Sequence, residues 1–394
     1  MSLHNKLIFS GLIISTFAVS ACGAATEQSV TTQETHVSDG VTEETTGVMQ
    51  TTVQASEETQ SEATAAPVKG FEWKTEAAKD HGMDSTALDE LHDLMKQQNA
   101  GSDSKVYSMV TVKDGVIIDE FYHEGYDAES TFPFHSCSKS VTGTLIGIAL
   151  NQRYIGSIDD PISKYLDKVN EQEDTHKRDI TIKDLLTNTS GLDWDEWNSY
   201  DVWNAFRSAP DWVDFILGRD LVYTPGEHFT YSTGNTHLLS AILEKATGKN
   251  QLEYAKEVLL TPLGMESVAW GADPQGITDG GNGIVMTARD GARFGQMCLQ
   301  NGLWEGEQIV PEEWFKESTT PKNGGYGDAN GSYGYQWWIQ SYKGYDMYYA
   351  YGFGGQYIFI VPELDMVNVI TSNNPEHSYR AREYFTEYVL DAVE

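Results

Sequence analysis

The sequence predicts an α/β protein of the α+β type, in which terminal helices flank an antiparallel sheet and a mostly helical subdomain is inserted between its strands. Three observations predict it. A helix and a β-hairpin lie near residue 100, helical segments fill the chain to roughly residue 320, and strand-like runs followed by a helix end it. Because strands and helices are grouped along the chain, an antiparallel sheet is favoured over an alternating parallel one.

Each element has its own local signal. Asp84-Ser85 precedes an amphipathic run as a capping residue precedes a helix. Asp114-Gly115 between β-branched and aromatic runs is a strong hairpin signal. The predicted helices cover 86–95, 137–151, 181–186, 236–246, 252–260, 288–300 and 378–393, and the predicted strands cover 106–113, 116–122, 347–351, 356–361 and 366–372. The helical subdomain would span about 140–330.

The composition excludes several classes of protein. Of 394 residues, 40% are hydrophobic and 11% aromatic, which is enough for a sizeable core. The net charge of −33 repels phosphate backbones, so we expect no nucleic-acid partner. Only three cysteines are present, which excludes a disulfide scaffold. The sequence also lacks zinc-site spacings and nucleotide-binding loops, so we expect no metal and no organic cofactor.

Residues 1–21 have the pattern of a lipoprotein signal peptide. Lys6 is the only charge before an apolar run of 13 residues, Leu7–Val19, which is too short to span a bilayer. The run ends at Val19-Ser20-Ala21-Cys22, which resembles the bacterial lipobox. This resemblance implies lipidation of Cys22 and an extracytoplasmic protein anchored to the cell membrane. The alternative is an ordinary signal peptide with an incidental cysteine.

Residues 22–69 are expected to form a disordered acidic tether rich in Thr, Ser and Glu. From 23 to 68 there is no Phe, Trp or Tyr, and there are eight acidic residues and no Lys or Arg. Such a stretch cannot bury enough apolar surface to offset the entropy of ordering. The folded domain is therefore expected to span 70–394.

The strongest candidate for chemistry is the pair Ser136 and Lys139, at the start of the long apolar helix. Residues three apart on a helix lie on the same face, one turn apart. A serine hydroxyl needs a base nearby, and a lysine can be that base if burial lowers its pKa. The helix N-terminus also carries partial positive charge where an oxyanion would form.

The same spacing occurs at Ser102 and Lys105, so the pattern alone has little predictive value. That copy lies in a polar stretch before the hairpin. Ser136 instead leads into an apolar run over 141–150. A buried helix would keep Lys139 away from water, so the context favours Ser136 as the nucleophile.

Segment 134–150 resembles the nucleophile helix of the serine β-lactamase and penicillin-recognition superfamily. Its class C branch, which includes family VIII carboxylesterases and nylon-oligomer hydrolases, fits best. Further segments resemble this branch in the same order, at 181–192, 224–227, 231–239, 262–265, 280–290, 333–338 and 352–356. The resemblance covers about 70–394. It implies a β-lactamase/transpeptidase-like fold and a serine hydrolase of the class C β-lactamase-like kind.

The resemblance also implies roles for single residues. Ser136 would be the nucleophile and Lys139 its proton partner. Tyr231 would be the class C tyrosine, a phenol that approaches phenolate near two cations, accepts the Ser136 proton and donates it to the leaving group. The backbone N–H groups of Ser136 and Gln356 would form the oxyanion hole.

Four positions are predicted to bind substrate, and two of them depart from class C β-lactamases. Phe353 stands where Lys or His usually holds a β-lactam carboxylate, and Thr233 stands where an Asn usually pairs with the acylamide side chain. Gly354 and Gly355 would let substrate approach the strand edge closely. Both departures favour an esterase or amidase. The sequence leaves open whether a cation from another loop, Arg207 or Lys322, replaces the missing one.

Other residues have weaker signals. Some tryptophans are candidates for an apolar acyl pocket or for core packing: Trp194, Trp197, Trp203, Trp337 and Trp338. Cys137 lies on the predicted buried helix and is expected to be inert, and no role is predicted for Cys298.

We therefore expect a lipid-anchored, monomeric serine hydrolase that cleaves an ester or amide bond through a Ser136 acyl-enzyme. Its substrate would be a small molecule, a peptide or a cell-wall component. The alternatives are a cell-wall D,D-peptidase or D-alanyl esterase, a β-lactamase, and a non-catalytic binding lipoprotein. The intact set of Ser136, Lys139 and Tyr231 argues against the non-catalytic alternative.

Overall fold

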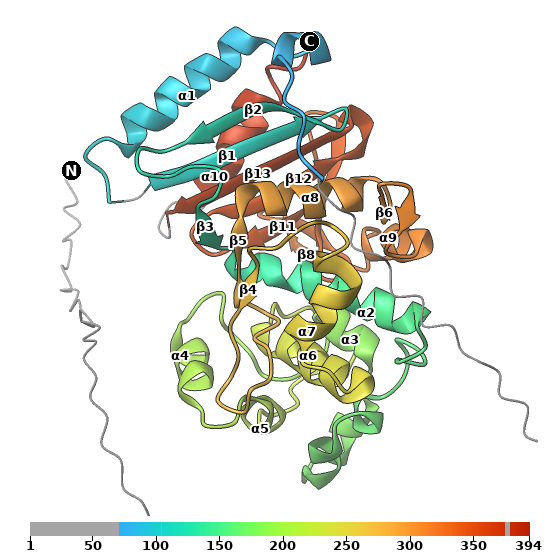
Figure 1. The fold of residues 1–394 in the computed structure, drawn as a ribbon. Coiled ribbons are helices and arrows are strands. Elements are labelled where there is room, and N and C mark those ends of the chain that lie inside the picture. Colours follow the sequence, from blue (N-terminus) through green and yellow to red (C-terminus); the bar gives the residue numbers. More distant parts are fainter. Residues whose placement is uncertain (1–70, 104, 375–378) are drawn as a thin grey trace, which may run out of the picture. The chain divides into compact units, whose positions relative to one another are not determined.

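The domain is built on an eight-stranded antiparallel sheet with the strand order β2-β1-β13-β12-β11-β10-β9-β8 (Figure 1). The computed structural model describes residues 71–103, 105–374 and 379–394, so the predicted signal peptide and tether lie outside the described residues. The strands are β1 (Lys105–Lys113), β2 (Val116–Tyr122), β8 (Asn323–Gly327), β9 (Gly331–Tyr333), β10 (Trp338–Tyr342), β11 (Tyr345–Gly352), β12 (Gln356–Val361) and β13 (Met366–Asn373). The predicted hairpin thus pairs with the last strand, which confirms an antiparallel sheet built from both chain ends.

Helices cover both faces of the sheet. On one face lie α1 (Ser85–Asn99) and α10 (Tyr379–Glu383), which continues into a π-helical turn over Tyr384–Val389. On the other face, α8 (Ala288–Leu299) packs against β1, β12 and β13. A Cβ atom at Gly295 of α8 would lie 2.6 Å from Val367, so this glycine permits the close approach of helix and strand. Because both faces are covered, β12 and β13 are buried almost throughout.

A group of helices lies beyond this sheet (Figure 1). It is organised around α6 (Thr233–Thr247), which packs against α2 (Ser138–Asn151), α3 (Ile182–Leu186), α5 (Trp212–Leu217) and α7 (Gln251–Ala255), while α4 (Asp201–Ser208) contacts α5. The group is shorter than the span of about 140–330 expected from the sequence. The difference arises because α8 packs on the sheet and β8, β9 and β10 are part of it.

Several short elements carried no clear signal in the sequence. A second sheet has the strand order β3-β5-β4, formed by β3 (Thr131–Pro133), β5 (Ile284–Thr287) and β4 (Ala269–Trp270). Two further strands, β6 (Leu303–Trp304) and β7 (Glu307–Gln308), precede α9 (Glu312–Ser318). In this second sheet, β3, which precedes α2, pairs with β5, which precedes α8.

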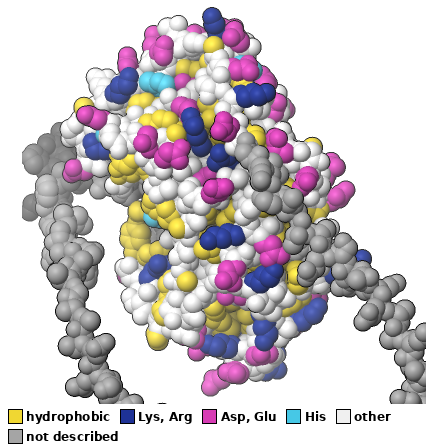
Figure 2. Space-filling view, viewed as in Figure 1, with side chains coloured by type: hydrophobic (Ala, Val, Ile, Leu, Met, Phe, Trp, Pro, Cys, Tyr) yellow, Lys and Arg dark blue, Asp and Glu magenta, His cyan; other side chains and the backbone are white. Residues whose placement is uncertain are grey.

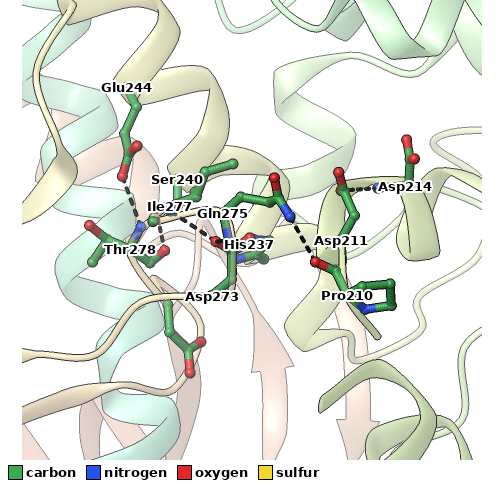
Figure 3. Close-up of polar contacts among 12 residues, drawn as sticks. Pro210, Asp211, Asp214, His237, Ser240, Glu244, Asp273, Gln275, Ile277 and Thr278 are labelled. Atoms are coloured by element: carbon green, nitrogen blue, oxygen red, sulfur yellow. Dashed lines mark hydrogen bonds and ion pairs between the residues drawn. The ribbon is translucent and has the colours of Figure 1, made fainter. Parts of the chain in front are cut away.

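The loop between β4 and β5 is attached to α6 by buried polar contacts (Figure 3). His237 Nε2 lies 3.1 Å from Asp273 Oδ2, and both side chains are fully buried. The Thr278 N–H donates to Glu244 Oε1 at 2.9 Å, and Ser240 Oγ donates to the Thr278 carbonyl oxygen at 2.7 Å. These contacts fix the path of a loop that also reaches the candidate site.

Acidic and basic side chains are interspersed over the face drawn in Figure 2, with hydrophobic side chains between them. This pattern is typical of a solvated protein surface. Within the described part of the chain, no helix is both long enough and apolar enough to cross a membrane.

Candidate active site

Ser136 lies in a short 3₁₀ turn, His135–Cys137, between β3 and α2. Ser138 Oγ donates to the His135 carbonyl oxygen at 2.6 Å and accepts from the Ile284 N–H at 3.0 Å, which joins the turn to β5. His135 has a φ of +47°, a left-handed conformation that non-glycine residues rarely adopt. The chain therefore bends just before Ser136, which lines a pocket.

Lys139 lies in the first turn of α2, and only 1% of its surface is exposed. Its Nζ atom is 3.0 Å from Ser136 Oγ, 2.8 Å from Thr233 Oγ1 and 2.8 Å from the Gly281 carbonyl oxygen. A Cβ atom at Gly281 would lie 2.7 Å from Thr233 Cγ2, so a glycine is required for this approach. The predicted Ser–Lys contact is thus present, and two distant segments enclose it.

Burial lowers the pKa of Lys139 to about 8, although the negative charges of Glu196 and Asp279 act in the opposite direction. The cause is the removal of the amine from water, which disfavours its charged form. A neutral amine is therefore accessible near neutral pH. Such an amine can accept a proton from Ser136.

Tyr231 is buried just before α6 and lines the same pocket as Ser136. Lys139 Nζ lies 4.8 Å from the centre of its ring. Burial, assisted by Tyr333 and Glu196, raises the pKa of Tyr231 well above its ordinary value. This environment argues against the phenolate that the family resemblance implied, and a protonated phenol is suited to donate a proton instead.

Thr233 is buried, and its hydroxyl group is engaged within the protein. It accepts a hydrogen bond from Lys139 and donates one to Glu196 Oε1 at 2.7 Å. Glu196 Oε2 accepts from the Thr233 N–H at 3.0 Å, at the start of α6, and from Trp194 Nε1 at 2.7 Å. Thr233 was predicted to bind substrate; it lines the pocket, but its hydroxyl links Lys139 to Glu196.

The turn between β11 and β12 contains the other residues predicted to bind substrate. Gly354 and Gly355 have φ values of +81° and +88°, a conformation that suits glycine. Neither is among the described residues that line the pocket. Phe353 does line it and is 45% exposed, with its ring centre 6.0 Å from that of His135.

Gln356 begins β12 beside the turn that carries Ser136. Its carbonyl oxygen accepts from Cys137 Sγ at 3.6 Å. Its side chain hydrogen bonds with both the N–H and the carbonyl group of Ser372 on β13. These contacts hold the start of β12 beside the turn that carries Ser136. The oxyanion hole formed by the N–H groups of Ser136 and Gln356 stays a prediction.

The pocket above Ser136 has a volume of about 510 Å³ and largely aromatic walls. Its aromatic lining consists of Trp197, Tyr200, Trp203, Tyr231, Tyr351, Phe353 and Tyr379. None of the described residues that line it is Lys or Arg. A larger hollow of about 1160 Å³, near Asp184 and Glu227, contains none of the predicted catalytic residues.

The two cations that the sequence left open are engaged elsewhere. Arg207 forms an ion pair with Asp279, and its guanidinium carbon lies 4.3 Å from the ring centre of Trp212. Lys322 pairs with Glu317, with 2.6 Å between Nζ and Oε2. Neither residue lines the pocket, so neither replaces the cation absent at Phe353.

The remaining residues considered in the sequence analysis are the tryptophans, two cysteines and the second Ser–Lys pair, and most of them are buried away from the pocket. Trp197 and Trp203 line the pocket, whereas Trp194, Trp337 and Trp338 are buried. Cys137 and Cys298 are buried as free thiols, and burial raises the pKa of both. At the second Ser–Lys spacing, Lys105 Nζ donates to the Asn99 carbonyl oxygen at 3.3 Å.

Sequence reasoning missed Glu196 and the part played by Gly281. Glu196 follows a segment that resembles the family and stands between acidic and aromatic residues, but no spacing relates it to Lys139. Gly281 lies within a segment that was matched as a block, with no role for its carbonyl group. Both were missed because their contacts with the Lys139 network depend on how distant segments pack.

Comparisons with known proteins agree with this fold. A family model described as Beta-lactamase matches residues 91–390. The 6-aminohexanoate-dimer hydrolase of Paenarthrobacter ureafaciens is 24% identical over 69% of this chain and 74% of its own length. A solved protein of Bacillus anthracis, to which the name 6-aminohexanoate-dimer hydrolase has been assigned, is 23% identical, with a TM-score of 0.66 over 82% of this chain and 87% of its own.

A third relative is an octameric penicillin-binding protein homologue from Pyrococcus abyssi. It is 22% identical, with a TM-score of 0.63 over 77% of this chain and 76% of its own. The likeness supports the predicted fold. Because that homologue is octameric, the likeness gives no support to the predicted monomer, which stays a prediction.

Proposed function

We propose that Ser136 is the nucleophile of this chain and that the protein cleaves an ester or amide bond through an acyl-enzyme. The chain belongs to the β-lactamase family and is a serine hydrolase. One observation carries the proposal. Lys139 Nζ lies 3.0 Å from Ser136 Oγ and 4.8 Å from the ring centre of Tyr231, and Ser136 and Tyr231 line the same aromatic pocket.

The acylation step follows from these contacts. Neutral Lys139 removes the proton of Ser136 as its Oγ attacks the substrate carbonyl carbon. The N–H groups of Ser136 and Gln356 stabilise the oxyanion of the tetrahedral intermediate. When the intermediate collapses, the proton that Lys139 took from Ser136 passes through the Tyr231 phenol to the departing oxygen or nitrogen, so that Lys139 is again neutral and Tyr231 again protonated. Water then attacks the Ser136 ester, which releases the acid and restores the serine.

The pocket favours an apolar or uncharged substrate over an anionic one. Its walls are aromatic, its only carboxylate among the described lining residues is Glu196, and no described lining residue is Lys or Arg. A substrate carboxylate would therefore lose its water without gaining a cationic partner, which is costly. An amide substrate is supported by the name of the Paenarthrobacter relative, 6-aminohexanoate-dimer hydrolase.

We also propose that the mature protein is attached to the outer side of the cell membrane through a lipid on Cys22. The support is the Val-Ser-Ala-Cys site after a short apolar run, followed by an aromatic-free acidic stretch. A tether of this composition would let the hydrolase domain reach substrates away from the membrane.

The experiment that tests the hydrolase is intact-mass spectrometry after exposure to a fluorophosphonate, a β-lactam and a p-nitrophenyl ester. The expected result is a stable fluorophosphonate adduct on Ser136 and turnover of the ester. An adduct at another residue, or no reaction with either the fluorophosphonate or the ester, would contradict the proposal.

A further inference from the structure

Glu196 is placed beside the catalytic lysine without touching the nucleophile. Its carboxylate accepts three hydrogen bonds, from Trp194 Nε1, the Thr233 N–H and the Thr233 hydroxyl group. The last of these is the informative contact, because the same hydroxyl oxygen accepts from Lys139 Nζ at 2.8 Å. Glu196, Thr233 and Lys139 thus form a chain of hydrogen bonds that ends 3.0 Å from Ser136 Oγ.

The direction of each hydrogen bond in this chain can be derived by counting protons. A threonine hydroxyl has a single proton, and a carboxylate can only accept. The Thr233 proton is therefore committed to Glu196, and toward Lys139 the Thr233 oxygen can only accept. The Gly281 carbonyl oxygen, 2.8 Å from Nζ, can also only accept.

This assignment fixes the orientation of the amine. A neutral lysine has two N–H donors and one lone pair. Both donors are used by Thr233 Oγ1 and the Gly281 carbonyl oxygen, so the lone pair points at the third neighbour, Ser136 Oγ. This is the orientation that a base needs in order to accept the serine proton.

We propose that Glu196 is a positioning residue that, through Thr233, directs the lone pair of Lys139 toward Ser136. The inference rests on the proposed function, in which Lys139 is the base. The inference adds Glu196, which does not contact the nucleophile, to the residues on which catalysis depends. It also explains why threonine suits position 233, where class C β-lactamases have asparagine.

Replacing Glu196 with glutamine reverses the chain of hydrogen bonds with almost no change in size. The Thr233 N–H and Trp194 Nε1 both donate to the same oxygen, so the carboxamide oxygen takes that place. The carboxamide nitrogen then faces Thr233 Oγ1 and donates to it. The Thr233 proton turns toward Lys139 and occupies the lone pair that should face Ser136.

A purely structural role for Glu196 predicts a different outcome. Its carboxylate also holds Trp194 and the first N–H of α6, so its loss could lower stability. A structural role would reduce the yield of folded protein without lowering kcat at high pH, where Lys139 is neutral in both proteins. The ionisable groups around Lys139 are Glu196, Asp279, Cys137, His135 and Tyr231. Removing the negative charge of Glu196 lowers the pKa of Lys139, so the acid limb of the activity profile should move to lower pH.

The test is the pH dependence of kcat and KM for p-nitrophenyl butyrate with wild type and Glu196→Gln. We expect kcat to fall about 10- to 100-fold, a typical effect of a misplaced catalytic group, with little change in KM and with an acid limb at lower pH. Glu317→Gln is the matched control, because Glu317 pairs with Lys322 away from the pocket. It should leave kcat and the acid limb unchanged.

A second pair of variants keeps the test decisive if Glu196→Gln fails to fold. Thr233→Val removes the hydroxyl group and should reduce kcat as Glu196→Gln does, whereas Thr233→Ser should recover most of that loss. Equal activity of the two Thr233 variants, or a folded Glu196→Gln protein with wild-type kcat and acid limb, would overturn the inference. If wild type itself neither hydrolyses the ester nor takes a fluorophosphonate on Ser136, the proposed function is wrong instead.

Discussion

Ser136 Oγ and Lys139 Nζ lie 3.0 Å apart across a single helical turn, and Lys139 is almost completely buried at that point. The spacing brings the two side chains to the same face, and burial lowers the pKa of the amine so that its neutral, proton-accepting form is accessible near neutral pH. At Lys105, where the same spacing recurs, the amine donates to a backbone carbonyl group instead. Burial by the surrounding segments, and not the spacing, distinguishes the two sites.

Ser136→Ala should abolish covalent labelling by a fluorophosphonate, because the alanine has no nucleophilic oxygen. Peptide mapping of the wild-type adduct should place the label on Ser136. Ser102→Ala serves as the control and should be labelled like wild type. Labelling that survives in Ser136→Ala would show that the nucleophile has been misassigned.

Lys139→Ala and Tyr231→Phe should each lower kcat by roughly 10²–10⁴-fold, the usual range for loss of general acid–base catalysis. The double variant should lose much less than the product of the two single effects, because residues that act as a unit are not additive. Steady-state kinetics on a p-nitrophenyl ester measures all three. A folded Tyr231→Phe protein with near wild-type kcat would exclude the tyrosine from the proton transfer.

The activity toward a neutral ester should rise with pH through an apparent pKa near 8. The sign follows from the base: only neutral Lys139 can accept the serine proton, and burial brings its pKa down to about 8. Protonation below that value should therefore reduce kcat/KM. Measuring kcat/KM from pH 5 to 10 checks this, and a profile that is flat between pH 6 and 9 would disagree with it.

A chromogenic cephalosporin should be hydrolysed with a far lower kcat/KM than a short p-nitrophenyl ester. Each charge-assisted hydrogen bond missing from the pocket corresponds to about 1.5–3 kcal/mol, or about 10- to 150-fold in affinity. Phe353→Lys would place a cation at a 45% exposed position on the pocket wall and should raise cephalosporin turnover. Phe353→Leu is the size control and should not. If wild type prefers the cephalosporin, the substrate class proposed here is wrong.

Cys22→Ser should release the protein from the membrane fraction or block its processing, because serine cannot form the thioether of a lipoprotein. Cell fractionation with detection of the protein measures the outcome. Cys298→Ser provides a control, since that thiol is buried within the domain. Unchanged membrane association of Cys22→Ser would exclude lipidation as the anchor.

The elements that the sequence predicted are those defined by local patterns. The hairpin over β1 and β2 was predicted from Asp114-Gly115, and α6, α8, β12 and β13 were predicted from apolar periodicity or continuous apolar runs. The short strands β3 to β7 had no such signal, because two to four residues are too few to show a period. The strand order could not be read locally either, since it pairs β1 with a strand that begins more than 250 residues later.

The sequence by itself determined that Ser136 and Lys139 share a helix face, because a three-residue spacing fixes that relationship wherever a helix forms. Only the tertiary structure decided what surrounds the amine. Its partners Thr233 and Gly281 are 94 and 142 residues away along the chain, and Glu196 joins them through Thr233. The tertiary structure also pairs Arg207 with Asp279, so the Arg207 guanidinium group does not supply a positive charge to the pocket. Contacts of this kind depend on which buried surfaces meet, and no local spacing encodes them.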